Sequence, residues 1–310
     1  MRKLRIGFIG AGSPNVATSA HLPALKQSDV FEIVMLADIN PQVEKYAAEY
    51  ACEWTNNAED LISREDIDII AVCTPDQFHY DLVKKGLLNN KHIVCEKPLA
   101  LESAQVEELF DYAEKQNLVL SIVSNARYLP IWKRFKEKLH DVKSLKYSVT
   151  GSIFSYPDGS FYRKAESGGQ FVHNGYHLCD LMCFLSSSQP EEVIGGSAYG
   201  GTTAKNYDFN TYTLSCIRME NGVIATIEQD LTRPREFKRE ERLVGWCYDS
   251  HVIYDNTKDI PAPDDFDAAV AFSSYYHEVY QQICGEYCDA LKIMNRQKKV
   301  MKTVLKTAGR

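Results

Sequence analysis

A short apolar run meets two closely spaced glycines in Leu4-Arg5-Ile6-Gly7-Phe8-Ile9-Gly10-Ala11-Gly12-Ser13-Pro14-Asn15, and a helical pattern follows as far as Leu25. The first glycine of such a turn permits a tight change of direction between strand and helix. The second lets the backbone approach a pyrophosphate at the helix N-terminus. The third position of the Gly-x-Gly-x-x-Gly pattern is Asn15, which we expect to loosen the packing of helix on strand. The stretch therefore predicts the first βα unit of a dinucleotide-binding domain.

The next apolar run, Phe31 to Ala37, closes on Asp38. A carboxylate at this position can hydrogen-bond both ribose hydroxyls of NAD, and it would repel the 2′-phosphate of NADP. Residues 39–42 contain no arginine that would bind that phosphate. NAD is therefore the expected cofactor, with NADP less favoured. Asp38 could also cap the helix that Pro41 opens, and the two roles are compatible.

The rest of the N-terminal part alternates between β-prone runs and helical patterns, as βαβ units do. The expected strands cover residues 54–55, 67–73, 92–95 and 118–123, and the expected helices cover 41–50, 78–88 and 102–116. The run at 67–73 is almost continuously apolar, which is typical of a parallel strand covered on both faces. We predict a doubly wound parallel sheet in a domain of residues 1–123.

The pattern changes after residue 123. Expected strands cover residues 145–154, 193–199, 212–219, 223–231 and 242–248, and Asn221-Gly222 is a strong hairpin signal between two of them. Helices are expected at 131–139, at 170–185 and from 276 onward. We predict a second, α+β domain of residues 124–310 with a mostly antiparallel sheet.

The run His92 to Cys95 ends in Glu96-Lys97-Pro98. Pro98 cannot donate to a sheet and biases Lys97 toward an extended backbone, so the strand stops here. In open α/β sheets, ligands bind at this carboxyl end of the strands. A solvated charged turn is the alternative. Thr74 and Pro75 end the neighbouring run and are expected beside the cofactor.

The second domain has its richest polar stretch between Gly168-Gly169 and Asp180. His173, His177 and Asp180 are spaced to share one helix face, and such a group commonly lines a cleft. The same three residues could bind zinc, but an Asp two turns from the first His is a poor ligand arrangement. The pairs Cys179/Cys183 and Cys284/Cys288 lack a matching second pair, so no metal site is predicted.

Length and composition limit the classes of function. The 310 residues suit about two domains, and 45% hydrophobic with 25% charged residues indicates a globular chain. The net charge is −7, and the only basic run is 296–306, so neither nucleic acid nor a membrane surface is an expected partner. The N-terminal apolar run is too short for a signal peptide, and no segment approaches the ~18 apolar residues of a membrane span. Nine scattered cysteines favour reduced thiols in a cytoplasm.

Taken together, these motifs resemble the glucose–fructose oxidoreductase / inositol dehydrogenase / MocA family. The residues that carry the resemblance occur in the family's order over most of the chain: Gly10-x-Gly12, Asp38, Cys73-Thr74-Pro75 with His79, Glu96-Lys97-Pro98, and Gly168-Gly169 leading to Gly175-x-His177-x-x-Asp180. The resemblance implies a Rossmann domain followed by a domain with a large open sheet that often serves as an oligomer interface. It also implies NAD(P)-dependent oxidoreduction of sugars, cyclitols or related hydroxy compounds.

The resemblance also assigns roles to individual residues. Lys97 corresponds to the family's catalytic lysine and His177 to its acid/base histidine, while His173 stands where the family commonly has an acid. Tyr162-Arg163 resembles a Trp-Arg pair that approaches the active site. The candidate cofactor-binding residues are Gly10, Gly12, Ser13, Asn15, Asp38, Thr74, Pro75, His79, Glu96, Lys97 and Asn125. The candidate substrate-binding residues are Lys97, Arg127, Arg163, His173, Asn174 and His177, with Lys97, His177 and His173 as the catalytic set.

The expected reaction is hydride transfer between the nicotinamide and a secondary alcohol or ketone of a sugar, cyclitol or related polyol. His177 takes the hydroxyl proton and Lys97 stabilises the developing alkoxide. Two alternatives remain open: a non-catalytic NAD-binding regulator on the same fold, and redox-neutral glycoside chemistry in which NAD is recycled. A homo-oligomer, dimer or tetramer, is expected from the resemblance.

Overall fold

The computed structural model describes residues 2–152, 167–200, 210–233, 236–262, 264–285 and 289–310. The chain divides into two compact units. The first unit contains residues 1–100, 104–125 and 268–298, and the second contains residues 101–103, 126–267 and 299–310. Residues 268–298, which the sequence analysis placed in the second domain, thus belong with the N-terminal strands and helices.

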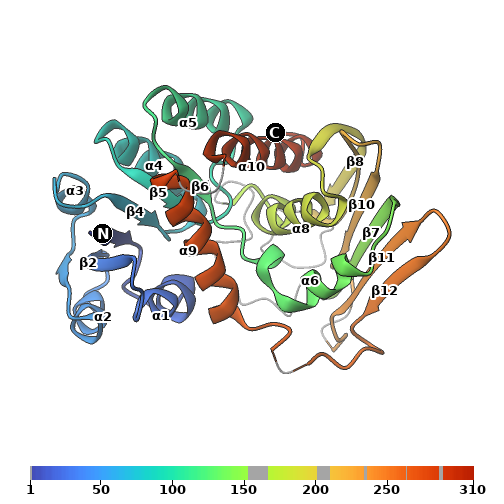
Figure 1. The fold of residues 1–310 in the computed structure, drawn as a ribbon, viewed down its shortest axis with the longest axis horizontal. Helices are drawn as coiled ribbons and strands as arrows, with labels where there is room; N and C mark the ends of the chain where they lie inside the picture. The colour runs from blue at the N-terminus through green and yellow to red at the C-terminus, as the bar shows by residue number, and fades with distance from the viewer. Residues whose placement is uncertain (1, 153–166, 201–209, 234–235, 263, 286–288) are drawn as a thin grey trace. The chain divides into compact units, whose positions relative to one another are not determined.

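The first unit is built on a six-stranded, all-parallel sheet with the order β3-β2-β1-β4-β5-β6. Its strands are β1 (Leu4–Ile9), β2 (Phe31–Ala37), β3 (Glu53–Thr55), β4 (Ile69–Val72), β5 (His92–Cys95) and β6 (Leu120–Ile122). Figure 1 shows helices on both sides of these strands, with α4 and α5 on one side and α1 and α2 on the other. This is the doubly wound parallel sheet predicted from the sequence, and its order reverses between β1 and β4, where such sheets bind dinucleotides.

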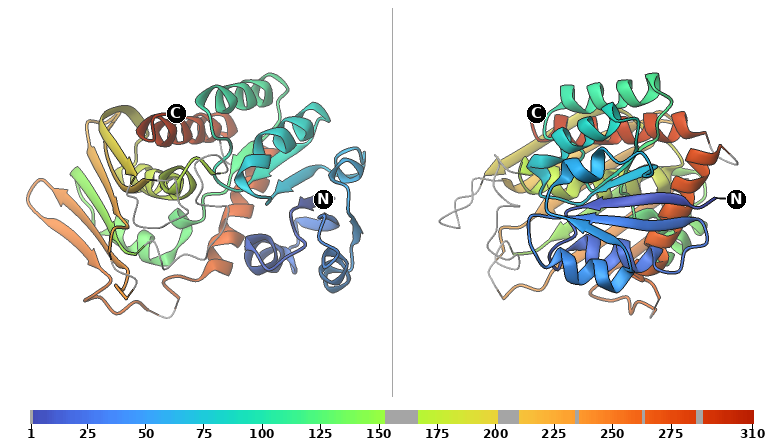
Figure 2. Two further views of the ribbon diagram at one scale, coloured as in Figure 1. Left: turned by 180° about the vertical axis from the view of Figure 1, so that it is seen from behind. Right: turned by 90° about the vertical axis from the view of Figure 1, so that its left-hand side faces the viewer.

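The helices of this unit range from the four-residue α1 to the 17-residue α9. They are η1 (Ala17–His21) with α1 (Leu22–Leu25), α2 (Val43–Tyr50), α3 (Ala58–Ile62), η2 (Asp76–Phe78) with α4 (His79–Leu88), α5 (Ser103–Lys115) and α9 (Ala268–Cys284). In α5 the buried residues Val106, Leu109, Phe110 and Ala113 recur at helical spacing and form one apolar stripe. Figure 2 shows α9 passing alongside α1 and the N-terminal strands, and the two helices are in contact.

The second unit contains a six-stranded mixed sheet with the order β12-β11-β7-β10-β9-β8. Its strands are β7 (Val142–Thr150), β8 (Pro190–Gly200), β9 (Asn210–Met219), β10 (Ile224–Asp230), β11 (Glu240–Cys247) and β12 (His251–Asp255). Neighbouring strands are antiparallel except for β7 and β10, which run parallel. The predicted mostly antiparallel sheet is confirmed, and β12 is a strand that the sequence analysis missed.

One face of this sheet is covered by α8 (Gln170–Ser186), which contacts β7, β9 and β10. In β7 the buried residues Leu145, Tyr147 and Val149 alternate with less buried polar ones, as expected for a sheet packed on one face. The remaining helices are η3 (Ala126–Tyr128), α6 (Pro130–Glu137) and α10 (Ala290–Thr307). None of the helices in the described part of the chain is both long and apolar enough to cross a membrane.

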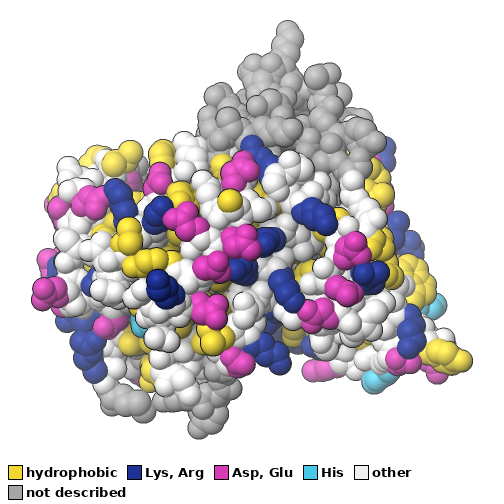
Figure 3. Space-filling view, turned by 90° about the horizontal axis from the view of Figure 1, so that it is seen from above, with side chains coloured by type: hydrophobic (Ala, Val, Ile, Leu, Met, Phe, Trp, Pro, Cys, Tyr) yellow, Lys and Arg dark blue, Asp and Glu magenta, His cyan; other side chains and the backbone are white. Residues whose placement is uncertain are grey.

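The basic run at the C-terminal end of the chain is partly neutralised by acids. Lys298 pairs with Asp111 at 2.5 Å, and Lys299 pairs with Glu220 at 2.5 Å. Figure 3 shows acidic and basic side chains interspersed over the face seen from above.

Candidate active site

In the glycine turn after β1, the backbone packs closely against neighbouring segments of the chain. Gly10 has a φ of +93°, a left-handed conformation that favours glycine. A Cβ on Gly10 would lie 2.6 Å from the carbonyl carbon of Cys73, and a Cβ on Gly12 would lie 2.6 Å from Cβ of Asp38. Both positions therefore require glycine, and they leave bare backbone at the carboxyl end of the sheet, as a bound pyrophosphate needs.

Asn15 does not loosen this turn, contrary to the expectation from the sequence. Its Nδ2 donates to the carbonyl oxygen of Gly10 at 2.7 Å, so the side chain closes the loop on itself. The amide N of Thr18 donates to Asn15 Oδ1 at 3.3 Å, and Thr18 Oγ1 donates to the Ser13 carbonyl at 3.0 Å. The polar side chains replace the glycine of the usual pattern by fixing the start of the helix, which opens with the π-helical turn η1.

Asp38 follows β2, and each of its carboxylate oxygens accepts a hydrogen bond from a backbone amide. The amide of Gly12 donates to Oδ2 at 2.7 Å, and the amide of Asn40 donates to Oδ1 at 2.8 Å. The carboxylate therefore holds the glycine turn and also caps the loop before α2. Its place beside Gly12 is where an NAD ribose would meet a carboxylate.

Side chains after β4 join the loops at the ends of two neighbouring strands. His79 is fully buried, and its Nδ1 and Nε2 lie 2.7 Å from the carbonyl oxygens of Pro98 and Thr74 respectively. The ring thus positions the Glu96-Lys97-Pro98 turn, whose Lys97–Pro98 peptide is cis, against the turn after β4. Thr74 Oγ1 is buried and has no hydrogen-bond partner within the described ranges, which leaves a polar group for a ligand at this edge.

Lys97 is half-buried at the end of β5, and two carboxylates act on it. Burial lowers its pKa below the ordinary lysine value, and the negative charges of Glu96 and Asp76 oppose this effect. Asp76 is itself buried, directly after the turn that ends β4. Asp76 has no role in the prediction from sequence, although its position after Thr74-Pro75 places it at the same edge of the sheet.

Glu96 has a buried partner that the sequence analysis also missed. Its Oε1 lies 2.9 Å from Nε2 of His21, and Nδ1 of His21 lies 2.6 Å from the hydroxyl oxygen of Tyr276. The only signal in the sequence was one histidine within an otherwise apolar helical pattern, since the partner residues are 75 and 255 positions away.

In the second unit, α8 carries the predicted histidines. Gly168 and Gly169 have φ values of +74° and +95°, so the two glycines make a turn that other residues rarely adopt and α8 starts directly after it. His173, Asn174 and His177 are half-buried, whereas Phe171, Val172, Gly175 and Tyr176 are buried in the unit. His173, Asn174 and His177 thus lie on the less buried side of α8, whereas Asp180, the third member of the predicted face, is fully buried.

Arg127 and Asp180 form a buried pair within the second unit. Nε of Arg127 lies 2.6 Å from Oδ2 of Asp180, and Nη2 lies 2.5 Å from Oδ1, which is a bidentate geometry. The pair joins η3 to α8, so Asp180 is engaged by Arg127 although its spacing matches that of His173 and His177. Tyr162 and Arg163 lie outside the described residues.

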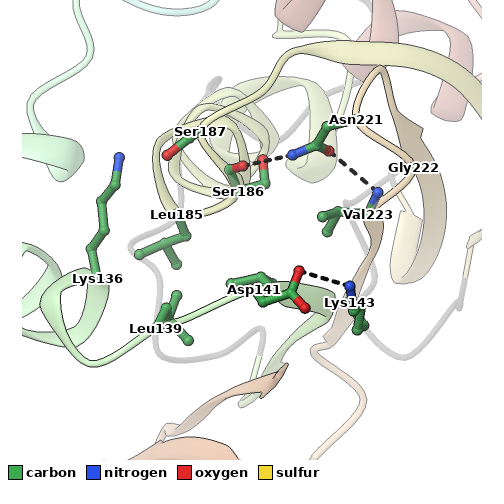
Figure 4. Close-up of a pocket in the computed structure, with 11 residues that line it drawn as sticks. Lys136, Leu139, Asp141, Lys143, Leu185, Ser186, Ser187, Asn221, Gly222 and Val223 are labelled. Carbon is green, nitrogen blue, oxygen red and sulfur yellow. Dashed lines mark hydrogen bonds and ion pairs between the residues drawn. The ribbon is translucent and has the colours of Figure 1, made fainter. Parts of the chain in front are cut away.

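A cavity of about 500 Å³ lies elsewhere in the second unit, at the C-terminal end of α8. Figure 4 shows Lys136, Leu185 and Val223 among its lining residues, with Asn221 donating to the Ser186 carbonyl at its rim. None of the predicted site residues lines it. Within the described ranges, no group of three or more His, Cys, Asp and Glu side chains is arranged to hold a metal ion.

Comparison with known proteins gives a consistent result for both halves of the chain. The model of an oxidoreductase family with an NAD-binding Rossmann fold, GFO/IDH/MocA, matches residues 4–124. The model of the GFO/IDH/MocA C-terminal domain matches residues 138–245.

Individual relatives are distant but extensive. An uncharacterized oxidoreductase, YrbE, of Bacillus subtilis is 24% identical over 271 residues, which are 85% of this chain and 74% of the relative. Myo-inositol 2-dehydrogenase of Thermotoga maritima is 23% identical over 296 residues, 93% of this chain and 86% of the relative. The solved structure of levoglucosan dehydrogenase in complex with NADH and L-sorbose has the same fold, with a TM-score of 0.80 at 15% identity, over 100% of this chain and 97% of the other.

Proposed function

Because the chain belongs to the GFO/IDH/MocA family of NAD-binding oxidoreductases, we propose that it is an NAD-dependent dehydrogenase of a secondary alcohol in a sugar, cyclitol or related polyol. The observation that carries the proposal is Lys97: a half-buried lysine at the carboxyl end of β5, beside the carboxylates of Glu96 and Asp76. The names of two relatives, an inositol dehydrogenase and a levoglucosan dehydrogenase, support the substrate class.

The residues of the first unit suit NAD. The bare backbone at Gly10 and Gly12 and the adjacent Ser13 would take the pyrophosphate, and Asp38 would take the ribose. Thr74, Pro75, Glu96 and Asn125 complete the cofactor-binding set, and His79 supports it through the carbonyls of Thr74 and Pro98. The charge of Asp38 favours NAD over NADP.

The chemistry divides between the cofactor and the chain. NAD, when bound, accepts a hydride from the carbon that bears the substrate hydroxyl, and the reduced form returns it to a ketone. His177 takes the hydroxyl proton as general base. The ammonium of Lys97 stabilises the negative charge that develops on the same oxygen. His173, Asn174, Arg163 and the region of Arg127 are the proposed substrate contacts.

We further propose that the enzyme acts as a homo-oligomer in the cytoplasm. The sheet face opposite α8 exposes Leu214, Trp246 and Ile253, which is apolar surface of the kind that subunit interfaces cover. The eight cysteines that the structure describes are all free thiols, which suits a reducing compartment.

Replacing Lys97 with Ala tests the proposal. With NAD and a panel of polyols and sugars, we expect K97A to lose 10²–10³-fold or more in kcat, as happens when one group that stabilises a developing oxyanion is removed. NAD affinity, measured by calorimetry, should change little. The matched control is Lys84→Ala, a half-buried lysine of α4 paired with Glu108 at 2.7 Å, which should keep full activity.

Two results would replace the proposal by another function. NAD binding without turnover of any substrate by the unmodified protein would favour a regulator. Co-purification of oxidised and reduced cofactor, with glycoside conversion and no net consumption of NAD, would favour redox-neutral chemistry. Full activity of K97A would remove Lys97 from the mechanism.

A further inference from the structure

His21 lies in a closed cage within the first unit. Its side chain is fully buried at the end of η1, and the rings of Phe8, Phe272 and Tyr276 surround it, with centroids 6.1, 4.6 and 5.7 Å from that of His21. The surrounding aromatic rings exclude water from His21. If its ring loses a hydrogen bond to the protein, no hydrogen bond to water replaces it, and the loss costs free energy. The two contacts it makes, to Glu96 and Tyr276, are therefore its defining environment.

The direction of these hydrogen bonds follows from the groups involved. A carboxylate only accepts, so Nε2 of His21 carries the proton that it donates to Oε1 of Glu96 over 2.9 Å. Burial raises the pKa of Tyr276 well above its ordinary value, with the nearby Cys73, Tyr275 and Glu96 acting in the same direction, so Tyr276 keeps its hydroxyl proton. The hydroxyl oxygen of Tyr276 lies 2.6 Å from Nδ1 of His21, so the two groups share a hydrogen bond.

The chain of hydrogen bonds continues to the backbone amide of Lys97. Oε2 of Glu96 accepts from the backbone amide of Lys97 at 3.2 Å, so one carboxylate oxygen is held by His21 and the other by the lysine's own main chain. Two donors on its oxygens orient the carboxylate. The titratable groups that act on Glu96 or Lys97 from the surrounding elements are His21, Cys73, Asp76, Cys95, Tyr275 and Tyr276.

We propose that His21 and Tyr276 are positioning residues for Lys97: they hold Glu96 as an oriented carboxylate beside the lysine that stabilises the alkoxide. Neither residue touches the substrate in this scheme. The proposal rests on the proposed function, in which the charged form of Lys97 is the active one. It assigns a role to a helix, α9, that contributes no predicted site residue.

The consequence is a specific change in pH dependence. Without the donor on His21, Glu96 loses its orientation, and Lys97 loses the aligned negative charge that opposes the effect of burial. The pKa of Lys97 then falls. Since the ammonium is lost as pH rises through this pKa, the alkaline decline of activity should move to lower pH.

Four substitutions separate this effect from simple damage. His21→Leu removes the donor and should lower kcat about tenfold, with the alkaline decline at lower pH and the KM for NAD within about twofold. In His21→Gln the side-chain amide can donate as Nε2 does, and most activity should return. Tyr276→Phe should shift the profile in the same direction by less. The matched control is Phe272→Leu, which alters the same cage without a polar contact and should reduce thermal stability but leave the pH profile unchanged.

A second measurement does not depend on turnover. The reactivity of Lys97 toward an amine-modifying reagent, followed by mass spectrometry across pH, gives its titration midpoint, which should be lower in H21L than in the unmodified protein. An unshifted midpoint, or equal pH profiles in H21L and F272L, would overturn the inference. Absence of dehydrogenase activity in the unmodified protein would overturn the proposed function instead, and the labelling comparison would still decide the role of His21.

Discussion

Lys97 is under two opposing influences, and their balance sets the pH at which the residue can act. Burial removes water from the ammonium and lowers its pKa, while Glu96 and Asp76 attract the positive charge and raise it. Burial is the larger effect. A dehydrogenase that depends on charged Lys97 should therefore lose activity on the alkaline side at a pH below about 10.4, the ordinary lysine pKa.

Arginine at the same position provides the test of this prediction. A guanidinium stays protonated in the accessible pH range, so Lys97→Arg should lower kcat but abolish the alkaline decline of kcat/KM. The measurement is a pH profile of both proteins with one substrate. If the decline persists unchanged in K97R, another group titrates there and Lys97 is not its source.

Single residues were also where sequence reasoning was strongest and weakest. Gly10, Gly12 and Asp38 were identified because a short local pattern carries their geometry. Asn15 was misjudged, since the pattern treats its position as a packing site and its side chain instead bonds the loop backbone. The resemblance predicts that Arg127 binds the substrate, and no sequence pattern indicates its buried partner, Asp180.

At the scale of elements, α8 depends on the glycines before it. Gly168 has a φ of +74°, and a Cβ there would lie 2.8 Å from Cγ1 of Val172. Gly222, in the hairpin between β9 and β10, has a φ of +84° but open space around it. A substitution at either glycine would strain the backbone. Only at Gly168 would the new Cβ also clash with a neighbouring side chain.

We expect Gly222→Ala to lower the free energy of unfolding by about 1–2 kcal/mol, the cost of a left-handed alanine. Gly168→Ala should cost about 1–3 kcal/mol more through the contact with Val172, and should lower kcat because the start of α8 carries His173 and His177. Urea unfolding and steady-state kinetics of both variants measure this. Equal stability and equal kcat in the two variants would show that the start of α8 tolerates the side chain.

Regular elements could be predicted where their apolar period was clear. All six strands of the parallel sheet and α8 match expectations within a few residues. The sequence analysis missed β12, which has only five residues, and it placed the start of α9 eight residues late. Asp267 lies directly before α9, and Asp is a residue type that commonly caps helices. It was therefore an available signal for the start of α9.

At the scale of the whole molecule, the open face of the second sheet is the surface that we propose joins subunits. Leu214 lies opposite Glu228 in the sheet, and Ile253 lies opposite Val244, so these side chains share the face that α8 leaves uncovered. Leu214, Trp246 and Ile253 are about 40% exposed, in surroundings that include the Lys146–Glu228 ion pair.

Leu214→Glu should therefore lower the molar mass measured by sedimentation, because a carboxylate in a closed interface must be desolvated. The matched control is Ile260→Glu, an almost fully exposed apolar residue outside the sheet, which should keep the mass of the unmodified protein. A monomeric unmodified protein, or an unchanged mass for L214E, would contradict the homo-oligomer.

The core of the site could be inferred only in outline from the sequence. Lys97 and its turn were found because the strand that precedes them is recognisable. The hydrogen-bonded group of His21, Glu96 and Tyr276 behind Lys97 could not be predicted, because these residues meet only when the parallel sheet and α9 have assembled. Long-range contacts of this kind leave no local pattern, whereas Glu96 beside Lys97 does.

The return of α9 to the first unit also bears on the order in which the chain is made. Ser121 and Ile122 of β6 form hydrogen bonds with Tyr275 and Gln297, and His21 forms one with Tyr276. The N-terminal strands therefore lack these partners until the C-terminal segment has been synthesised. About 170 residues separate Asn125 from Lys298. At bacterial and eukaryotic translation speeds this is a delay of roughly 10–35 s, during which the nascent sheet and His21 are uncovered. The nascent sheet thus completes these hydrogen bonds only after α9 and Gln297 have been synthesised.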